Sequence, residues 1–225
     1  MTLEEYFGDW LKVIDVPELQ KVTAQVTRLY HIKPVVPEYE NIFKAFRLCS
    51  LHDLKVVFLG QDPYPQKGVA TGVLFGNKEG TEQLSPSLEV IKEAAINYEV
   101  YHNPYTFDIT LESWAQQGIL MINSALTCEM NRIGSHVMLW RPFISKLLKN
   151  LSLYEPGTIY VLFGSQAQTF EPYINKQFNH IIKVQHPAYF ARTGKKMPYE
   201  LFTQINTLLK GQYGIPIKWY DDLLT

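Results

Sequence analysis

An acid and an aromatic residue directly follow a strongly apolar run in the first third of the chain. Asp62 and Tyr64 stand in the segment Gly-Gln-Asp-Pro-Tyr at 60–64, immediately after the apolar residues 56–59. A valine-rich run of this kind is typical of a strand covered on both faces, and open parallel sheets bind ligands just beyond the carboxyl ends of such strands. With a reference pKa of about 3.9, the Asp62 carboxyl is ionised at pH 7. The structural alternative is a turn-forming Asp before Pro63.

Three other strand-like runs are also followed by polar side chains. The runs are residues 119–122, 159–163 and 181–184, and the residues after them are Asn123, Ser124, Gly164, Ser165, Gln185 and His186. Helical patterns between the runs supply the long crossovers that parallel strands require. Parallel strands bring their carboxyl ends to one edge of a sheet, so we expect the Asp, Asn, Ser and His side chains to form a site there. For any one of these strand ends taken singly, an ordinary polar turn explains the polar residues equally well.

The remaining patterns indicate the elements that position these residues. Apolar residues at helical spacing predict helices at 3–10, 17–30 and 42–46, with Pro34 and Pro37 breaking the pattern before the last of them. Helices that alternate with four strands predict an α/β fold around a four-stranded, mostly parallel sheet.

The amino-acid composition limits the classes of function that the protein could have. With 46% apolar and 19% charged residues, the 225-residue chain is expected to fold as one globular domain over residues 1–225. A formal net charge of −1 gives no global basic signal, so a nucleic acid would have to be held by a local patch. Cys49 and Cys128 are far apart, which favours reduced thiols and indicates no cysteine metal site.

No apolar stretch in the sequence approaches the roughly 18 residues of a membrane span, and the amino-terminal region lacks a signal-peptide charge pattern. We therefore expect a cytoplasmic protein that does not bind membranes, or a nuclear one if the host is eukaryotic.

Four ordered motifs give the chain a resemblance to the family 1 uracil-DNA glycosylases. They are G-Q-D-P-Y at 60–64, I-N-S-A-L-T at 122–127, F-G-S at 163–165 and H-P at 186–187. The family cleaves the bond between uracil and deoxyribose in DNA, without a metal or cofactor. The resemblance therefore implies a three-layer α/β/α sandwich, a monomer, and a DNA repair hydrolase that leaves an abasic site in base excision repair.

The resemblance assigns the chemistry to two residues. Asp62 would stabilise the cationic, oxocarbenium-like sugar and orient the attacking water. His186 would donate a hydrogen bond to O2 of the departing uracil, where negative charge collects, and a neutral or a charged imidazole could do so.

Four residues are expected to bind the base, which must first be flipped out of the duplex. Asn123 matches the O4 and N3–H edge of uracil, whereas cytosine presents the opposite pattern. Tyr64 would exclude the C5 methyl group of thymine, and Phe75 would stack on the ring. Gln61 belongs to the same motif. Without the resemblance, Phe75 would be interpreted as a core residue.

Five residues are expected to contact the DNA. Ser87 and Ser165 fall where the family's small loops grip the backbone, with helix capping as the alternative for Ser87. Phe190 takes the position of the family's intercalating leucine and is expected to act as the wedge. Tyr189 and Arg192 lie beside it in sequence.

The segment around Phe190 also departs from the family pattern H-P-S-P-L-S. Ala188 and Ala191 replace two serines, so two backbone hydrogen bonds are expected to be missing. Lys195 and Lys196, with Arg192, form a basic cluster that is expected either to meet DNA phosphates or to be a solvated loop.

A second departure is Pro65, where the family usually has histidine, and it removes a backbone donor and an imidazole. The expected partners are uracil-containing DNA, single- or double-stranded, and proteinaceous glycosylase inhibitors. The alternatives are a catalytically weak DNA-binding or replication-accessory protein of the same fold and an enzyme with broadened base choice.

Overall fold

The computed structural model describes residues 2–97 and 105–222, and a four-stranded sheet lies at its centre in the order β4-β2-β6-β7. The strands are β2 (Val56–Gly60), β4 (Ile119–Asn123), β6 (Ile159–Phe163) and β7 (His180–Val184). β2 and β4 end one residue later than predicted, and β7 begins one residue earlier. Every pair in this sheet is parallel, so the predicted four-stranded, mostly parallel sheet is confirmed.

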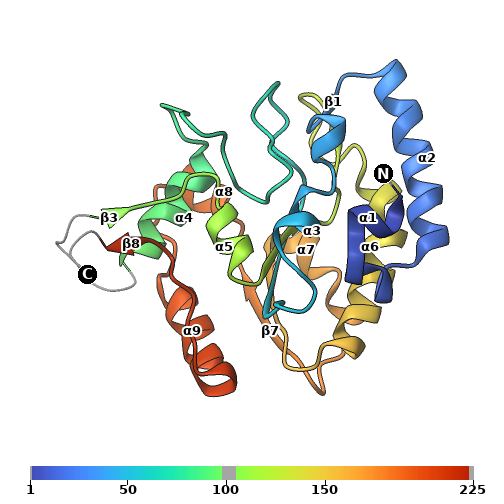
Figure 1. Ribbon diagram of the computed structural model, residues 1–225. Helices are drawn as coiled ribbons and strands as arrows, with labels where there is room; N and C mark the ends of the chain where they lie inside the picture. The colour runs from blue at the N-terminus through green and yellow to red at the C-terminus, as the bar shows by residue number, and fades with distance from the viewer. Residues whose placement is uncertain (1, 98–104, 223–225) are drawn as a thin grey trace.

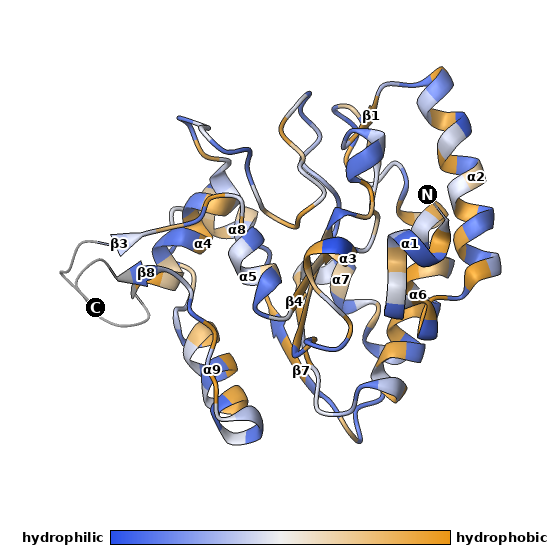
Figure 2. Cartoon of the chain, in the orientation of Figure 1, coloured by the Kyte–Doolittle hydropathy of each residue, from blue (hydrophilic) through white to orange (hydrophobic). Residues whose placement is uncertain are grey.

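Side chains of the sheet alternate between two apolar cores, because successive residues of a strand point to opposite faces. In β2, Val57 and Leu59 join one core, while Val56 and Phe58 join the other. Figure 2 shows β4 and its neighbours as hydrophobic ribbons between helices of mixed hydropathy. Burial on both faces is the reason that β2, β4 and β6 have almost entirely apolar sequences, whereas the edge strand β7 includes the exposed residues His180 and Lys183.

Helices cover both faces of the sheet. One core is covered by α1 (Leu3–Phe7), α2 (Val16–Ile32), α3 (Lys44–Leu48) and α6 (Val137–Tyr154). The other is covered by α4 (Pro86–Asn97), α5 (Glu112–Gln116), α8 (Pro187–Thr193) and α9 (Glu200–Tyr213). In Figure 1, α1, α2 and α6 lie to the right of the sheet and α4, α8 and α9 to the left. The predicted three-layer α/β/α sandwich is therefore confirmed.

The predicted helices differ from the observed ones mainly at their ends. The helix expected at 17–30 is α2, which begins after Asp15; the Asp15 side chain accepts the Glu18 N–H at 2.9 Å and caps the helix. The helix expected at 3–10 divides at Gly8, whose φ of +50° ends α1 and starts a 3₁₀ helix.

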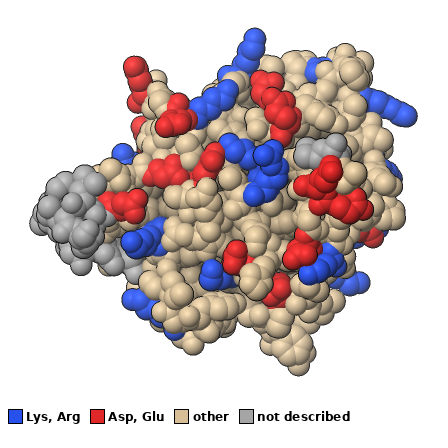
Figure 3. Space-filling view, in the orientation of Figure 1, with Lys and Arg blue, Asp and Glu red and all other residues tan. Residues whose placement is uncertain are grey.

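Shorter elements complete the described chain. They are the 3₁₀ helices η1 (Gly8–Lys12), η2 (Tyr39–Asn41) and η3 (Glu171–Tyr173), the helix α7 (Gly164–Gln168), and the antiparallel pairs of β1 (Val35–Val36) with β5 (Cys128–Glu129) and β3 (Tyr105–Thr106) with β8 (Asp221–Asp222). Among the described residues, no helix has the length and apolarity needed to cross a bilayer. Basic and acidic side chains are interspersed over the face in Figure 3.

Candidate active site

The carboxyl ends of the four parallel strands surround a pocket of about 420 Å³. The predicted site residues that line it are Gln61, Asp62, Tyr64, Phe75, Ser87, Asn123, Ser165, His186, Tyr189 and Arg192. Every strand end contributes to this set, which is the convergence that parallel strands produce. A pocket of this size suits a small ligand or one nucleotide unit.

Asp62 is held by one of its two carboxylate oxygens. Oδ2 accepts hydrogen bonds from Nε2 of Gln61 at 2.7 Å and from the backbone N–H of Gly134 at 3.0 Å. Neither donor is the backbone N–H two residues ahead that an Asx turn would use. Oδ1 is buried and bonds to none of the described residues. Asp62 therefore presents one unused oxygen in a pocket-lining position.

The protonation of Asp62 is set by opposing effects. Burial raises the pKa of its carboxyl above the usual value, while the hydrogen bonds from Gln61 and Gly134 lower it. Burial is the larger effect, so protonation of Asp62 begins at a higher pH than for an exposed aspartate.

Gly134 is a site residue that sequence reasoning missed. It lies between β5 and α6 with a φ of +81°, a conformation that favours glycine. The same segment is fastened to the loop after β2 by the Asn131 N–H, which donates to the carbonyl of Pro65 at 3.0 Å. Pro65 thus retains an anchoring role through its carbonyl. The only sequence signal was an isolated glycine in a polar stretch.

His186 has a defined tautomer. It caps the first turn of α8, and its Nδ1 accepts the Ala188 N–H at 3.1 Å. An accepting Nδ1 leaves the ring proton of the neutral imidazole on Nε2. Burial, and then the positive charge of Arg192, lowers the pKa of His186 to about 4. At neutral pH, His186 is therefore a neutral ring that donates from Nε2.

Gly164 allows His186 to approach the end of β6. A Cβ atom on Gly164 would lie 2.9 Å from Cβ of His186, and its φ of +82° also favours glycine. The next residue, Ser165, is exposed in the first turn of α7 and lines the pocket.

Asn123 is the last residue of β4 and pairs in register with Gly60 at the end of β2. It is 9% exposed, and its Oδ1 bonds to none of the described residues. A Cβ atom on Gly60 would come within 2.6 Å of this oxygen. The glycine of the G-Q-D-P-Y motif therefore leaves room for the amide, which offers a buried acceptor to a ligand.

Tyr64 and Phe75 form an aromatic part of the pocket wall. Tyr64 Oη donates to the carbonyl of Phe75 at 3.0 Å. The Phe75 ring lies edge-on to Phe163 and His186, with centroids 5.2 and 5.5 Å away. Its φ is +64°, which is uncommon for a bulky side chain and is kept only where neighbouring contacts enforce it.

The residues expected to contact the DNA backbone differ in burial and in local structure. Ser87 is buried inside α4, and Ser85, just before the helix, accepts the Leu88 N–H through its carbonyl at 2.8 Å. Asn77 in turn accepts the Ser85 N–H at 2.8 Å. Ser85 therefore stands at the capping position, and capping does not explain Ser87. Arg192 is exposed at the pocket.

Phe190 is the one predicted site residue that does not line the pocket. It is 9% exposed, belongs to the core beneath α8, and is not among the residues that line the pocket. Its neighbour Tyr189 lines the pocket, and Lys195 lies 5.8 Å from the centre of that ring. The burial argues against Phe190 as the wedge, because the helical conformation of α8 turns it inward.

The protonation state of His186 is directly measurable. In a ¹⁵N and ¹H NMR titration, the His186 ring should keep its Nε2–H tautomer at neutral pH and titrate with a midpoint of about 4. Arg192→Gln should raise that midpoint, whereas the same change at exposed Lys196 should leave it unaltered. A midpoint near the reference value of about 6.5 would show that the ring is not buried and neutral.

Comparisons with known proteins agree with this geometry. Residues 46–210 match the model of the Uracil DNA glycosylase superfamily. Proteins named uracil-DNA glycosylase from Yersinia pestis and Photorhabdus laumondii are 36% identical over 194 residues and 33% identical over 192 residues. Each alignment covers 85% of this chain, and 83% and 84% of the respective relative.

A solved structure of a mimivirus UNG variant in complex with UGI superposes with a TM-score of 0.78 at 25% identity, covering 90% of this chain and 82% of that one. The structure of mimivirus uracil-DNA glycosylase itself, at 24% identity and a TM-score of 0.76, shares the fold and covers 97% and 93% of the two chains. The chain belongs to the uracil DNA glycosylase superfamily.

Proposed function

We propose that this protein is a family 1 type uracil-DNA glycosylase, which flips uracil out of DNA, hydrolyses the N-glycosidic bond and leaves an abasic site for base excision repair. One observation carries the proposal. A buried carboxylate oxygen of Asp62 and a neutral imidazole of His186 belong to one pocket, together with the amide of Asn123.

The pocket's polar atoms match the edges of uracil. The Asn123 amide would accept from N3–H and donate to O4, while Phe75 stacks on the ring and Tyr64 excludes a C5 methyl group. Cytosine would leave the buried amide wrongly paired, because its N3 accepts and its exocyclic amine donates. These contacts would hold a flipped base whose unpairing and unstacking cost a few kcal/mol.

Hydrolysis breaks the bond between C1′ of the sugar and N1 of uracil. The bonding electron pair leaves with the base, and the Nε2–H of His186 stabilises the negative charge that collects on O2. The sugar becomes cationic as the bond lengthens, and the Asp62 carboxylate stabilises it. A water molecule oriented by Oδ1 then adds its oxygen to C1′, with its proton passing to the carboxylate.

The interaction with DNA would be local. Ser87, Ser165 and Arg192 would contact phosphates around the pocket mouth, and Lys195 would add a cation beside Tyr189. We assign the wedge to Tyr189, because it lines the pocket while Phe190 lies in the core. A proteinaceous inhibitor would bind the same surface.

Four further expectations stay predictions. They are a single domain over residues 1–225, a monomeric state, a cytoplasmic or nuclear location, and independence from cofactors.

Asp62→Asn should abolish most uracil release. The loss of the carboxylate charge should lower single-turnover release from a uracil-containing oligonucleotide by about 10²–10⁴-fold, the range typical of an acid–base group. Exposed Asp9 provides the matched control, because Asp9→Asn makes the same change at a residue that does not line the pocket. Wild-type protein that binds the DNA without releasing base would instead indicate the catalytically weak DNA-binding protein.

The wedge assignment predicts a strand-dependent effect. Tyr189→Ala should reduce release from duplex uracil about 10-fold more than release from single-stranded uracil, since only the duplex has a space to be filled after flipping. Phe190→Ala should lower the free energy of unfolding by about 3–5 kcal/mol without changing the duplex-to-single-strand ratio. The opposite pattern would return the wedge to Phe190, and Tyr39→Ala is the control for an exposed tyrosine elsewhere.

A further inference from the structure

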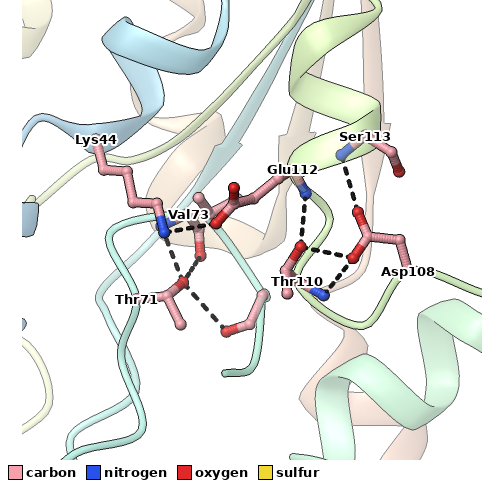
Figure 4. A network of polar contacts seen from close by, with 8 residues as sticks. Lys44, Thr71, Val73, Asp108, Thr110, Glu112 and Ser113 are labelled. Atoms are coloured by element: carbon pink, nitrogen blue, oxygen red, sulfur yellow. Dashed lines mark hydrogen bonds and ion pairs between the residues drawn. The ribbon is translucent and has the colours of Figure 1, made fainter. Parts of the chain in front are cut away.

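Residues 71–76, here called the Phe75 loop, form a wall between two hollows. Thr71 lines the pocket at the strand ends, and it also lines a second hollow of about 600 Å³ bounded by Lys44, Asp108 and Glu112. Figure 4 shows Thr71 between Lys44 and Val73, with the Asp108–Thr110 network beside it. The threonine is 8% exposed, so its hydroxyl must be satisfied from within the protein.

The Thr71 hydroxyl closes this loop on itself. Its Oγ1 accepts the Val73 N–H at 3.2 Å, and the carbonyls of Val73 and Gly76 each lie 3.5 Å away as acceptors for its proton. The Gly76 N–H bonds back to the Val73 carbonyl at 3.1 Å. One hydroxyl therefore joins the start of the loop to the residues on both sides of Phe75.

The loop controls two rings of the proposed base pocket. Phe75 adopts a φ of +64° within it, a conformation that contacts on both sides must maintain. The carbonyl of the same residue accepts the hydroxyl proton of Tyr64 at 3.0 Å. A shift of the Phe75 backbone would therefore move the ring that stacks on the base and release the ring that blocks its C5 position.

The rest of the loop is already fixed to the scaffold. A Cβ atom on Gly72 would lie 1.9 Å from the carbonyl oxygen of Asn41, so the backbone is pressed against the residues before α3. The Leu74 N–H donates to the carbonyl of Met121 in β4 at 3.1 Å.

A salt bridge joins the helices behind the loop, with Lys44 Nζ of α3 2.5 Å from Glu112 Oε1 of α5 (Figure 4). The loop's two flanks are thus anchored from outside. Inside the loop, the Thr71 hydroxyl and the backbone hydrogen bond from Gly76 to Val73 together hold the backbone on both sides of Phe75.

We propose that Thr71 is a positioning residue for base selection, which acts through the Phe75 carbonyl on the Tyr64 ring. The inference rests on the proposed function, since it assigns Tyr64 and Phe75 to the uracil pocket. Thr71 itself touches neither the sugar nor the departing base in this account. Its effect is on which C5 substituents the pocket tolerates.

The test is the selectivity of Thr71→Val, which keeps the shape of the side chain and removes the hydroxyl. Oligonucleotides carrying uracil, 5-fluorouracil or thymine present C5 substituents of increasing size. Kcat/KM for uracil should fall about 5- to 10-fold, mostly through KM, as expected from the loss of one buried hydrogen bond. Kcat/KM for 5-fluorouracil should fall less than kcat/KM for uracil. The ratio of 5-fluorouracil release to uracil release should therefore rise, and thymine release should rise as well.

Three controls separate selectivity from stability. Thr71→Ser should restore the wild-type ratio, because it returns the hydroxyl. Thr207→Val removes an exposed hydroxyl that bonds to Thr203 in α9 and should change nothing. Tyr64→Phe breaks the same link from its other end and should shift the ratio in the same direction. The effects of Tyr64→Phe and Thr71→Val should combine less than additively in the double variant.

A lowered thermal midpoint with an unchanged base ratio in both Thr71→Val and Tyr64→Phe would overturn the inference. If Thr71→Val does not fold, the ratio in Tyr64→Phe decides alone. Wild-type protein that releases no uracil would instead overturn the proposed function, so the two failures are distinguishable.

Discussion

Asp62 and His186 each use one polar atom of the side chain for a backbone hydrogen bond, and the other atom bonds to none of the described residues. Asp62 accepts the Gly134 N–H on Oδ2, and His186 accepts the Ala188 N–H on Nδ1. This constraint fixes which atoms can meet a ligand, namely Oδ1 and the Nε2–H. It also explains why the fold must bring the segment before α6 and the first turn of α8 to the same sheet edge.

The electrostatics of the pocket depend on burial more than on charge. Desolvation raises the pKa of Asp62 and lowers the pKa of His186, so both groups are biased toward their neutral forms. Hydrogen bonds to Asp62 oppose that bias and favour its carboxylate. At His186, the positive charge of Arg192 strengthens the bias toward the neutral form, because it disfavours the imidazolium. The same guanidinium is exposed at the pocket. In the proposed complex, a phosphate bound by Arg192 would offset this charge and so link DNA contact to the protonation of His186.

The sheet and the convergence of the strand ends were predictable because they follow from local patterns. Apolar runs such as 159–163 are long enough to identify a buried strand, and parallel pairing then places Asp62, Asn123 and His186 together. The contribution of Gly134 was not predictable, since it acts through a hydrogen bond to Asp62 that forms only after distant segments pack. The proposed role of Thr71 was not predictable either, because its local hydrogen bonds to Val73 and Gly76 depend on the folded course of the loop. Phe190 and Tyr189 are neighbours in sequence, and only the rotational position of α8 decides which is buried.

The most direct measurement of the central claim is the pH dependence of single-turnover uracil release. His186 has a folded pKa lowered to about 4, so its neutral form persists below its usual pKa of 6.5. The stability that the neutral ring contributes is complete above pH 6.5 and is lost as pH falls from 6.5 to about 4, because the unfolded chain binds the proton first. Asp62, whose pKa is raised, loses its carboxylate over a range that begins above the usual aspartate value of 3.8.

The rate should therefore stay level through pH 6.5 and fall only at more acid pH, with the Asp62 contribution to that fall missing in Asp62→Asn. A change in rate with a midpoint near 6.5 that Asp62→Asn does not alter would contradict the account, because it would mean that His186 titrates as an exposed imidazole.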